Sequence, residues 1–401
     1  MTGSGRGRML AAATIGYTLN LWAWALLGPL APAIADTLRL TPVQQALVVA
    51  APVVIGALGR IPIGALTDRF GGHIMLPVVS LATVVPVLYL GLAGRTSLAG
   101  LLVGGLVLGI GGTAFAAGVP LVSARFPPAR RGLAIGVFGM GICGSAVSGL
   151  ATLRLSDAHG PATPFVVVAA ALGGYAVIAV LLRDPPGPPR RRARPSRTLA
   201  AAVRLRITWR AGGLYAIALS GYVAFTVYLP SYLENGYGTR PRDAATWMAV
   251  LVLLAVVMRP VGGRLSDRVT PTRTLTGALA VLVAAATVQA FTPGLAPVGT
   301  MALLSIAAAL GVLSAATLAL VAQVVPPPMI GSVAGIAGAV GGVAGFLAPL
   351  VMGSSYGRYG SYGPALTLLA VSAATALLCN ARSGRRGVAH APGGPPLDHR
   401  E

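Results

Sequence analysis

Apolar residues fill most of this chain in long stretches, and charged residues gather in the short segments between them. A transmembrane α-helix needs about 20 consecutive, predominantly apolar residues to cross the hydrocarbon core of a bilayer. Twelve stretches meet this length, so the pattern predicts an all-α membrane protein with twelve transmembrane helices. The expected spans are residues 10–34, 43–66, 74–94, 97–122, 132–153, 161–182, 211–233, 244–266, 273–292, 297–324, 330–352 and 361–380.

A change of composition divides these spans into two sets of six. The sequence RDPPGPPRRRARPSR at residues 183–197 is too rich in proline and arginine to form a packed core, and it predicts a cytoplasmic linker. We therefore expect a first six-helix half at residues 1–182, a linker at 183–209, a second six-helix half at 210–381 and a disordered cytoplasmic tail at 382–401.

The two halves repeat one another at a constant offset of 199 residues. This offset relates Arg60 to Arg259 and Asp68 to Asp267, and it still holds further along for a set of glycines: Gly132, Gly136 and Gly139 map to Gly331, Gly335 and Gly338. One register held over that distance indicates a parallel duplication, in which the two pseudo-symmetric halves are related by an axis along the membrane normal.

Arg60 and Arg259 lie inside apolar stretches, each eight residues before an aspartate. At a rise of about 1.5 Å per residue, this spacing places each guanidinium group about 12 Å from the end of its helix, close to the middle of the bilayer. Ionisable residues at that depth usually face a cavity or a partner, although a long arginine side chain can also extend to the interface. Two cations at matched depth predict a binding site for an anion.

Composition agrees with a membrane protein, because 55% of the residues are hydrophobic, 10% are charged and the mean hydropathy is +0.79. The net charge of +21 could by itself suggest nucleic-acid binding. However, 22 of the 30 arginines fall in segments expected on the cytoplasmic side, and six fall on the other side. This positive-inside bias predicts that both termini are cytoplasmic, with the lipid bilayer and no nucleic acid as partner.

Several segments of the chain resemble a known family. The segment GALTDRFGGH at residues 64–73 is similar to the signature loop of the major facilitator superfamily. The chain further resembles the nitrate/nitrite porter family of that superfamily through nearly all twelve spans. The segments that carry this resemblance are RIPIGALTDRFGG from Arg60, GIGGTAFAAGVPLVSARFPPARRGLAIGVFGMG from Gly109, GYVAFTVYLPSYL from Gly221 and GSVAGIAGAVGGVAGFLAPLVMG from Gly331.

The resemblance implies the major facilitator fold and a set of binding residues. Arg60 and Arg259 would hold the anion, and the aromatic rings of Phe115 and Tyr215 would shape the site. The resemblance places the backbone at Gly139 and Gly338 against the substrate, although small residues at this spacing also promote close helix packing. Asp68 would latch the two halves on the cytoplasmic side in one state, with Arg69 beside it, and the alternative for Asp68 is a solvated loop acid.

The chain departs from the family pattern at two positions. Ile142 stands where relatives commonly carry an asparagine, and Leu219 stands where an aromatic residue is common. Both changes make the expected site more apolar, and Ile142 in place of asparagine also removes a hydrogen-bond donor to the substrate.

The chemistry of arginine suits nitrate and nitrite, because the planar guanidinium group offers paired N–H donors and stays charged at physiological pH. No Asp, Glu or His is expected at mid-depth in the bilayer, so an ordinary proton carrier is missing. We therefore expect a monomeric secondary transporter that exchanges nitrate for nitrite, without a cofactor.

Other functions remain open at this stage. The same fold could export another small organic anion or a drug, or it could act as an anion sensor that does not transport. An enzyme is not expected, because GMGICG at residues 139–144 approaches the dinucleotide-binding fingerprint but follows no strand.

Overall fold

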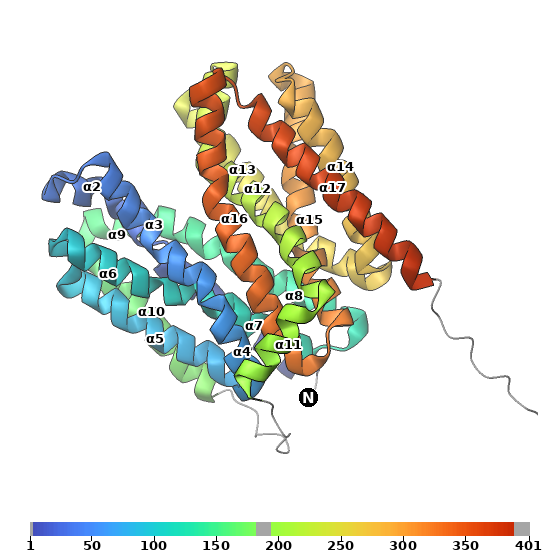
Figure 1. Cartoon of the computed structure of the whole chain (residues 1–401). Coiled ribbons are helices and arrows are strands. Elements are labelled where there is room, and N and C mark those ends of the chain that lie inside the picture. Colours follow the sequence, from blue (N-terminus) through green and yellow to red (C-terminus); the bar gives the residue numbers. More distant parts are fainter. Residues whose placement is uncertain (1–2, 182–193, 389–401) are drawn as a thin grey trace, which may run out of the picture.

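The computed structural model describes residues 3–181 and 194–388, and its helices form a bundle of twelve candidate membrane spans (Figure 1). The all-α fold and the count of twelve spans are as predicted. The first six spans are α1 (Gly3–Trp24) with α2 (Leu27–Leu38), α3 (Pro42–Leu58) with α4 (Arg60–Phe70), α5 (Gly72–Leu92), α6 (Leu98–Leu108) with α7 (Ala114–Arg125), α8 (Pro128–Gly139) with α9 (Gly144–His159), and α10 (Thr163–Leu181). The second six are α12 (Arg206–Tyr237), α13 (Pro241–Arg268), α14 (Pro271–Ala290), α15 (Thr300–Val324), α16 (Ile330–Tyr359) and α17 (Gly363–Val388).

Local sequence explains where several of these helices begin. Pro128, Pro241 and Pro271 occupy the first turn of α8, α13 and α14, where the missing N–H costs no helical hydrogen bond. Thr41 begins α3 with a capping box, in which its hydroxyl accepts from Gln44 N and the Gln44 side chain accepts from Thr41 N.

The helices pack as two six-helix halves that meet at one end. In the second half, α12 packs on α16, α13 on α15 and α14 on α17, and in the first half α5 packs on α10. The main contacts between the halves are α4 with α16 and α8 with α13. Figure 1 shows the ribbons of the two halves converging toward α4, α8 and the start of α16, and diverging toward the opposite end.

The first span is interrupted between Trp24 and Leu27, and three further spans of the first half are interrupted near their middle, whereas their counterparts in the second half are continuous. The second span breaks at Gly59, the fourth through a 3₁₀ segment at Gly109–Thr113, and the fifth through a 3₁₀ segment at Met140–Cys143. Their counterparts α13, α15 and α16 run without a break. Backbone carbonyls released at such breaks are available to side chains in the bundle interior.

The connection between the halves contains a helix that the sequence did not predict. Residues 183–193 of the expected linker lie outside the described residues, and the rest of the linker includes α11 (Pro195–Arg204). This helix contacts α4 of the first half and α16 of the second half. At the other end of the chain, α17 continues to Val388, past the expected end of the last span at residue 380, and residues 389–401 lie outside the described range.

Candidate functional site

Arg60 lies at the break of the second span and extends from the first half to the second. Its Nε donates to the carbonyl of Gly112 at 3.1 Å, and its Nη1 donates to the carbonyl of Gly338 at 2.7 Å. The 3₁₀ segment that contains Gly112 interrupts the fourth span and leaves this carbonyl accessible. The guanidinium group is half-buried, and its carbon lies 5.4 Å from the centre of the Phe115 ring.

Arg259 makes the corresponding contact in the opposite direction. Its Nη1 donates to the carbonyl of Gly139 at 3.1 Å, across the boundary between the halves. Its side chain is 3% exposed, and its guanidinium carbon lies 5.8 Å from the centre of the Tyr222 ring. Its Nε is buried and has no hydrogen-bond partner among the described residues.

These two contacts obey the sequence duplication. The offset of 199 residues relates Arg60 to Arg259 and also Gly139 to Gly338. Each arginine donates to a glycine carbonyl of the other half, and the two glycines are equivalent in the duplication, as the two arginines are. Neither guanidinium group has an acidic partner among the described residues, and both point into the bundle rather than toward lipid. The structure therefore brings the two predicted cations to one interior region.

The two glycines allow the arginines to approach the backbone. A Cβ atom at Gly338 would lie 3.0 Å from Arg60 Cδ and 3.1 Å from Phe115 Cε1. A Cβ atom at Gly139 would lie 3.3 Å from Arg259 Nη1. Both glycines thus lie against the arginine side chains of the candidate site.

Aromatic rings line the region between the two arginines. Phe115 and Tyr215, which the sequence predicts as site residues, are fully buried and stacked with ring centres 5.3 Å apart. The ring centre of Tyr17 lies 6.1 Å from that of Phe115, and Tyr17 is near both guanidinium groups. The sequence analysis missed Tyr17 and Tyr222, although Tyr222 shares a helix face with Tyr215, seven residues earlier.

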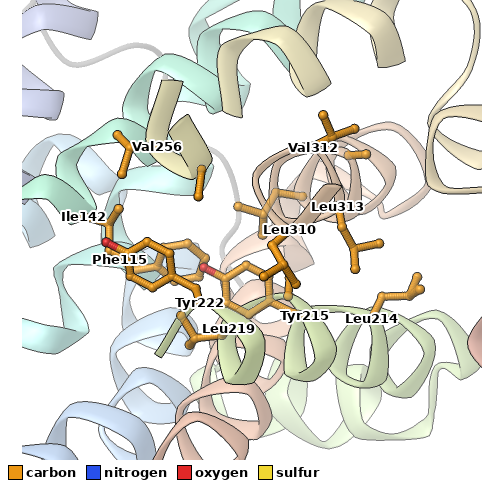
Figure 2. Packing of buried hydrophobic residues seen from close by; sticks show 14 of the residues in the cluster. Phe115, Ile142, Leu214, Tyr215, Leu219, Tyr222, Val256, Leu310, Val312 and Leu313 are labelled. Carbon is orange, nitrogen blue, oxygen red and sulfur yellow. The ribbon is translucent and has the colours of Figure 1, made fainter. Parts of the chain in front are cut away.

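The two positions that depart from the family pattern also lie in this region. Ile142 and Leu219 are 6% and 8% exposed, and Figure 2 shows them close to Phe115, Tyr215 and Tyr222. These two positions therefore place buried apolar side chains beside the aromatic rings of the region.

Asp68 lies at the end where the halves meet, here called the aspartate end. Its carboxylate accepts hydrogen bonds from Gly331 N at 2.7 Å, from Ser332 N at 2.7 Å and from Ser332 Oγ at 2.6 Å. These donors belong to the first turn of α16, where unpaired N–H groups and the helix dipole favour a negative charge. Asp68 is therefore half-buried between the halves instead of being a solvated loop acid. Its neighbour Arg69 is exposed, with its guanidinium carbon 5.2 Å from the Phe70 ring.

Asp267 makes the duplicate contact, which the sequence analysis did not predict. Its two carboxylate oxygens accept from Gly132 N at 2.7 Å and from Leu133 N at 2.8 Å, in the second turn of α8. The counterpart of Ser332 at this position is Leu133, so Asp267 lacks the third hydrogen bond. The aspartate end is thus closed by two related but unequal contacts.

A separate cavity of about 290 Å³ lies between α12, α16 and α17 and contains neither arginine. Its lining is almost entirely apolar, with Phe225 and Leu229 on α12 and Leu347 on α16. The lining contains no cationic side chain to balance an anion, so this cavity does not compete with the arginine region as the candidate site. Within the described ranges, no group of three or more His, Cys, Asp or Glu residues could hold a metal ion.

Comparison with known proteins identifies relatives over most of the chain. A family model of the Major Facilitator Superfamily matches residues 13–349. The chain is 41% identical over 359 residues to the "Probable nitrate/nitrite transporter NarK2" of Mycobacterium tuberculosis, covering 88% of this chain and 90% of that relative. It is 31% identical over 284 residues to the "Nitrite extrusion protein" of Bacillus subtilis, covering 71% of each protein.

Solved structures support the same fold. The human organic anion transporter MFSD10 superposes with a TM-score of 0.74 at 17% identity, covering 94% of this chain and 99% of that chain. The transporter FucP in its outward conformation superposes with a TM-score of 0.73 at 18% identity, covering 93% and 98%. At these identities, the similarity concerns the fold.

Proposed function

The chain belongs to the nitrate/nitrite porter family of the major facilitator superfamily, and we propose that it carries nitrate and nitrite across a membrane by alternating access. It is a multi-pass membrane protein. The distribution of arginines supports cytoplasmic N and C termini, which makes the aspartate end cytoplasmic. In this assignment the described structure is closed on the cytoplasmic side. We further propose that the protein acts as a monomer within the bilayer.

The observation that carries this proposal is the pair of arginines that bond carbonyls of opposite halves. An anion between Arg60 and Arg259 would accept hydrogen bonds from both guanidinium groups. It would also neutralise their positive charge, which neutral backbone carbonyls stabilise only in part. Planar nitrate suits the planar donor fork of arginine. Phe115 and Tyr215 would cover the faces of the anion, and Gly139 and Gly338 would provide the close backbone approach.

The same charge balance supports exchange rather than proton symport. Two cations without a carboxylate partner repel one another in a medium of low dielectric constant, and a bound anion reduces that repulsion. An empty site therefore has a larger barrier to the occluded state than a loaded site. Nitrate entry would be balanced by nitrite exit, because neither half can reorient readily without an anion.

For gating, we propose that the Asp68 and Asp267 contacts break when the cytoplasmic side opens. Each contact joins an acid of one half to the first or second turn of a helix in the other half, so separation of the halves must release both. Arg69 would remain beside this contact on the exposed side.

The test is nitrate uptake into proteoliposomes that contain the purified protein, with and without nitrite inside. We expect fast uptake only with internal nitrite, and competition by nitrite but not by formate, bicarbonate or chloride. Uptake driven by a pH gradient alone would contradict exchange. Saturable nitrate binding without uptake under any condition would contradict transport and would indicate an anion sensor.

A further inference from the structure

The two arginines are equivalent in sequence but not in their hydrogen bonds. Arg60 uses Nε and Nη1 for two carbonyls, whereas Arg259 uses Nη1 for one carbonyl and keeps a buried, unpaired Nε. The reason lies in the helix that faces each arginine. Gly112 belongs to the break of the fourth span, while its counterpart Gly311 lies inside the continuous helix α15, where its carbonyl belongs to the helical ladder.

A second buried donor beside Arg259 is also unpaired. The hydroxyl of Tyr222 has no hydrogen-bond partner among the described residues, and the tyrosine is 6% exposed. The hydroxyls of Ser145 and Thr226 lie near this tyrosine, but they donate to the carbonyls of Ile142 and Tyr222, each at 2.9 Å, and neither is in hydrogen-bond geometry with the tyrosine hydroxyl. Buried polar groups without partners are uncommon in proteins and costly, so each one indicates a missing partner.

Tyr222 and Arg259 lie together on the side of the site that Ile142 and Leu219 make more apolar. The guanidinium carbon of Arg259 is 5.8 Å from the Tyr222 ring centre, and Tyr222 also lies near Cys143, the neighbour of Ile142. Tyr222 also follows Leu219 by one helical turn. A hydroxyl donor and an aromatic ring are therefore present where the sequence predicted the loss of both.

We infer that Tyr222 is a direct ligand of the transported anion, and that its hydroxyl and the free Nε of Arg259 donate to two oxygens of one planar oxyanion. This inference rests on the proposed function. Both donors come from the second half, so this half holds the anion more tightly than the first half, whose Arg60 already bonds two carbonyls. A tyrosine with a structural role differs visibly, as Tyr232 shows by accepting from Gln289 Nε2.

The test is the variant Tyr222→Phe, which keeps the ring against Arg259 and removes only the hydroxyl. We expect the dissociation constant for nitrate to rise about tenfold, which corresponds to about 1.4 kcal/mol. The matched control is Tyr175→Phe, which removes the hydroxyl of a buried tyrosine on α10, away from both arginines. This control is expected to bind nitrate like the parent.

Thermal unfolding in detergent provides a second readout that separates the ligand role from a structural role. Without nitrate, Tyr222→Phe is expected to unfold at the same temperature as the parent or higher, because it removes an unpaired buried hydroxyl. With saturating nitrate, its stabilisation is expected to be smaller than that of the parent. Parent-like nitrate affinity in Tyr222→Phe, or a loss of stability without nitrate, would overturn the inference. A parent protein that binds no nitrate would instead contradict the proposed function.

Discussion

Removal of the two aspartates at the aspartate end is expected to have unequal effects. Asp68 accepts three hydrogen bonds from the first turn of α16, whereas Asp267 accepts two from the second turn of α8. The difference is the hydroxyl of Ser332, whose counterpart is Leu133. Both Asp68→Ala and Asp267→Ala should therefore favour the state that is open at this end, and Asp68→Ala should do so more strongly.

The magnitudes follow from these contacts. Loss of a buried, hydrogen-bonded charge typically costs about 2 kcal/mol or more, which shifts the conformational equilibrium about 30-fold for either aspartate. The hydrogen bond from Ser332 Oγ adds about 1 kcal/mol, or about a fivefold difference between the two variants. In a Ser332→Ala background, this difference should disappear, because both aspartates then accept two backbone hydrogen bonds.

Spin-label distances measure this equilibrium directly. Labels at Ala129→Cys and Val324→Cys occupy exposed positions on opposite halves, near the hydrogen bond of 2.9 Å from Arg131 Nη1 to the Ala322 carbonyl. The background replaces both cysteines, Cys143 and Cys379, with alanine. Equal shifts for the two aspartate variants, or a difference that persists in Ser332→Ala, would refute the assignment of the asymmetry to this hydroxyl.

Three further outcomes are expected from the contacts of the site and the linker. Arg60→Lys should lower the nitrate uptake rate at least tenfold at equal protein amounts, because lysine lacks the planar fork that bonds two carbonyls and an anion together; parent-like uptake would contradict this. Gly338→Ala should reduce nitrate uptake about tenfold, and Gly139→Ala should reduce it less. The new methyl carbon would lie 3.0 Å from its nearest neighbour at Gly338 and 3.3 Å from it at Gly139. A larger loss of uptake in Gly139→Ala than in Gly338→Ala would argue against this geometry. Thr208→Val should speed tryptic cleavage within α11 several-fold, because Thr208 Oγ1 donates to the Ala202 carbonyl at 2.6 Å and fixes the end of that helix; unchanged cleavage would show that other contacts hold it.

Much of the fold could be predicted from the sequence, because a bilayer permits few solutions. A run of about 20 apolar residues must be helical to satisfy its backbone, so counting such runs was enough to find the spans. The duplication was readable because charges inside those runs are rare, and Arg60 and Arg259 could therefore be aligned without ambiguity. The structure adds that the same offset governs their contacts across the halves.

The remaining features depend on contacts between distant segments. Tyr17 and Tyr222 look like ordinary membrane aromatics in the sequence, and only the packing of α1 and α12 beside the arginines gives them significance. The breaks at Gly59 and Gly109–Thr113 were hidden because glycine in a membrane helix serves packing as often as it serves interruption. Helix α11 was missed because proline and arginine dominate the segment that leads into it.

Helix α11 rests on α4 of one half and on α16 of the other, and it cannot keep both contacts once those helices separate. In a transporter that works by alternating access, every cycle must therefore include a step in which this short helix comes away from one of its supports. We therefore expect the contacts of α11 to lower the turnover rate, whichever anion is transported. Changes on its buried side, such as at Ala202, would set the speed of the cycle while leaving the affinity for the anion intact.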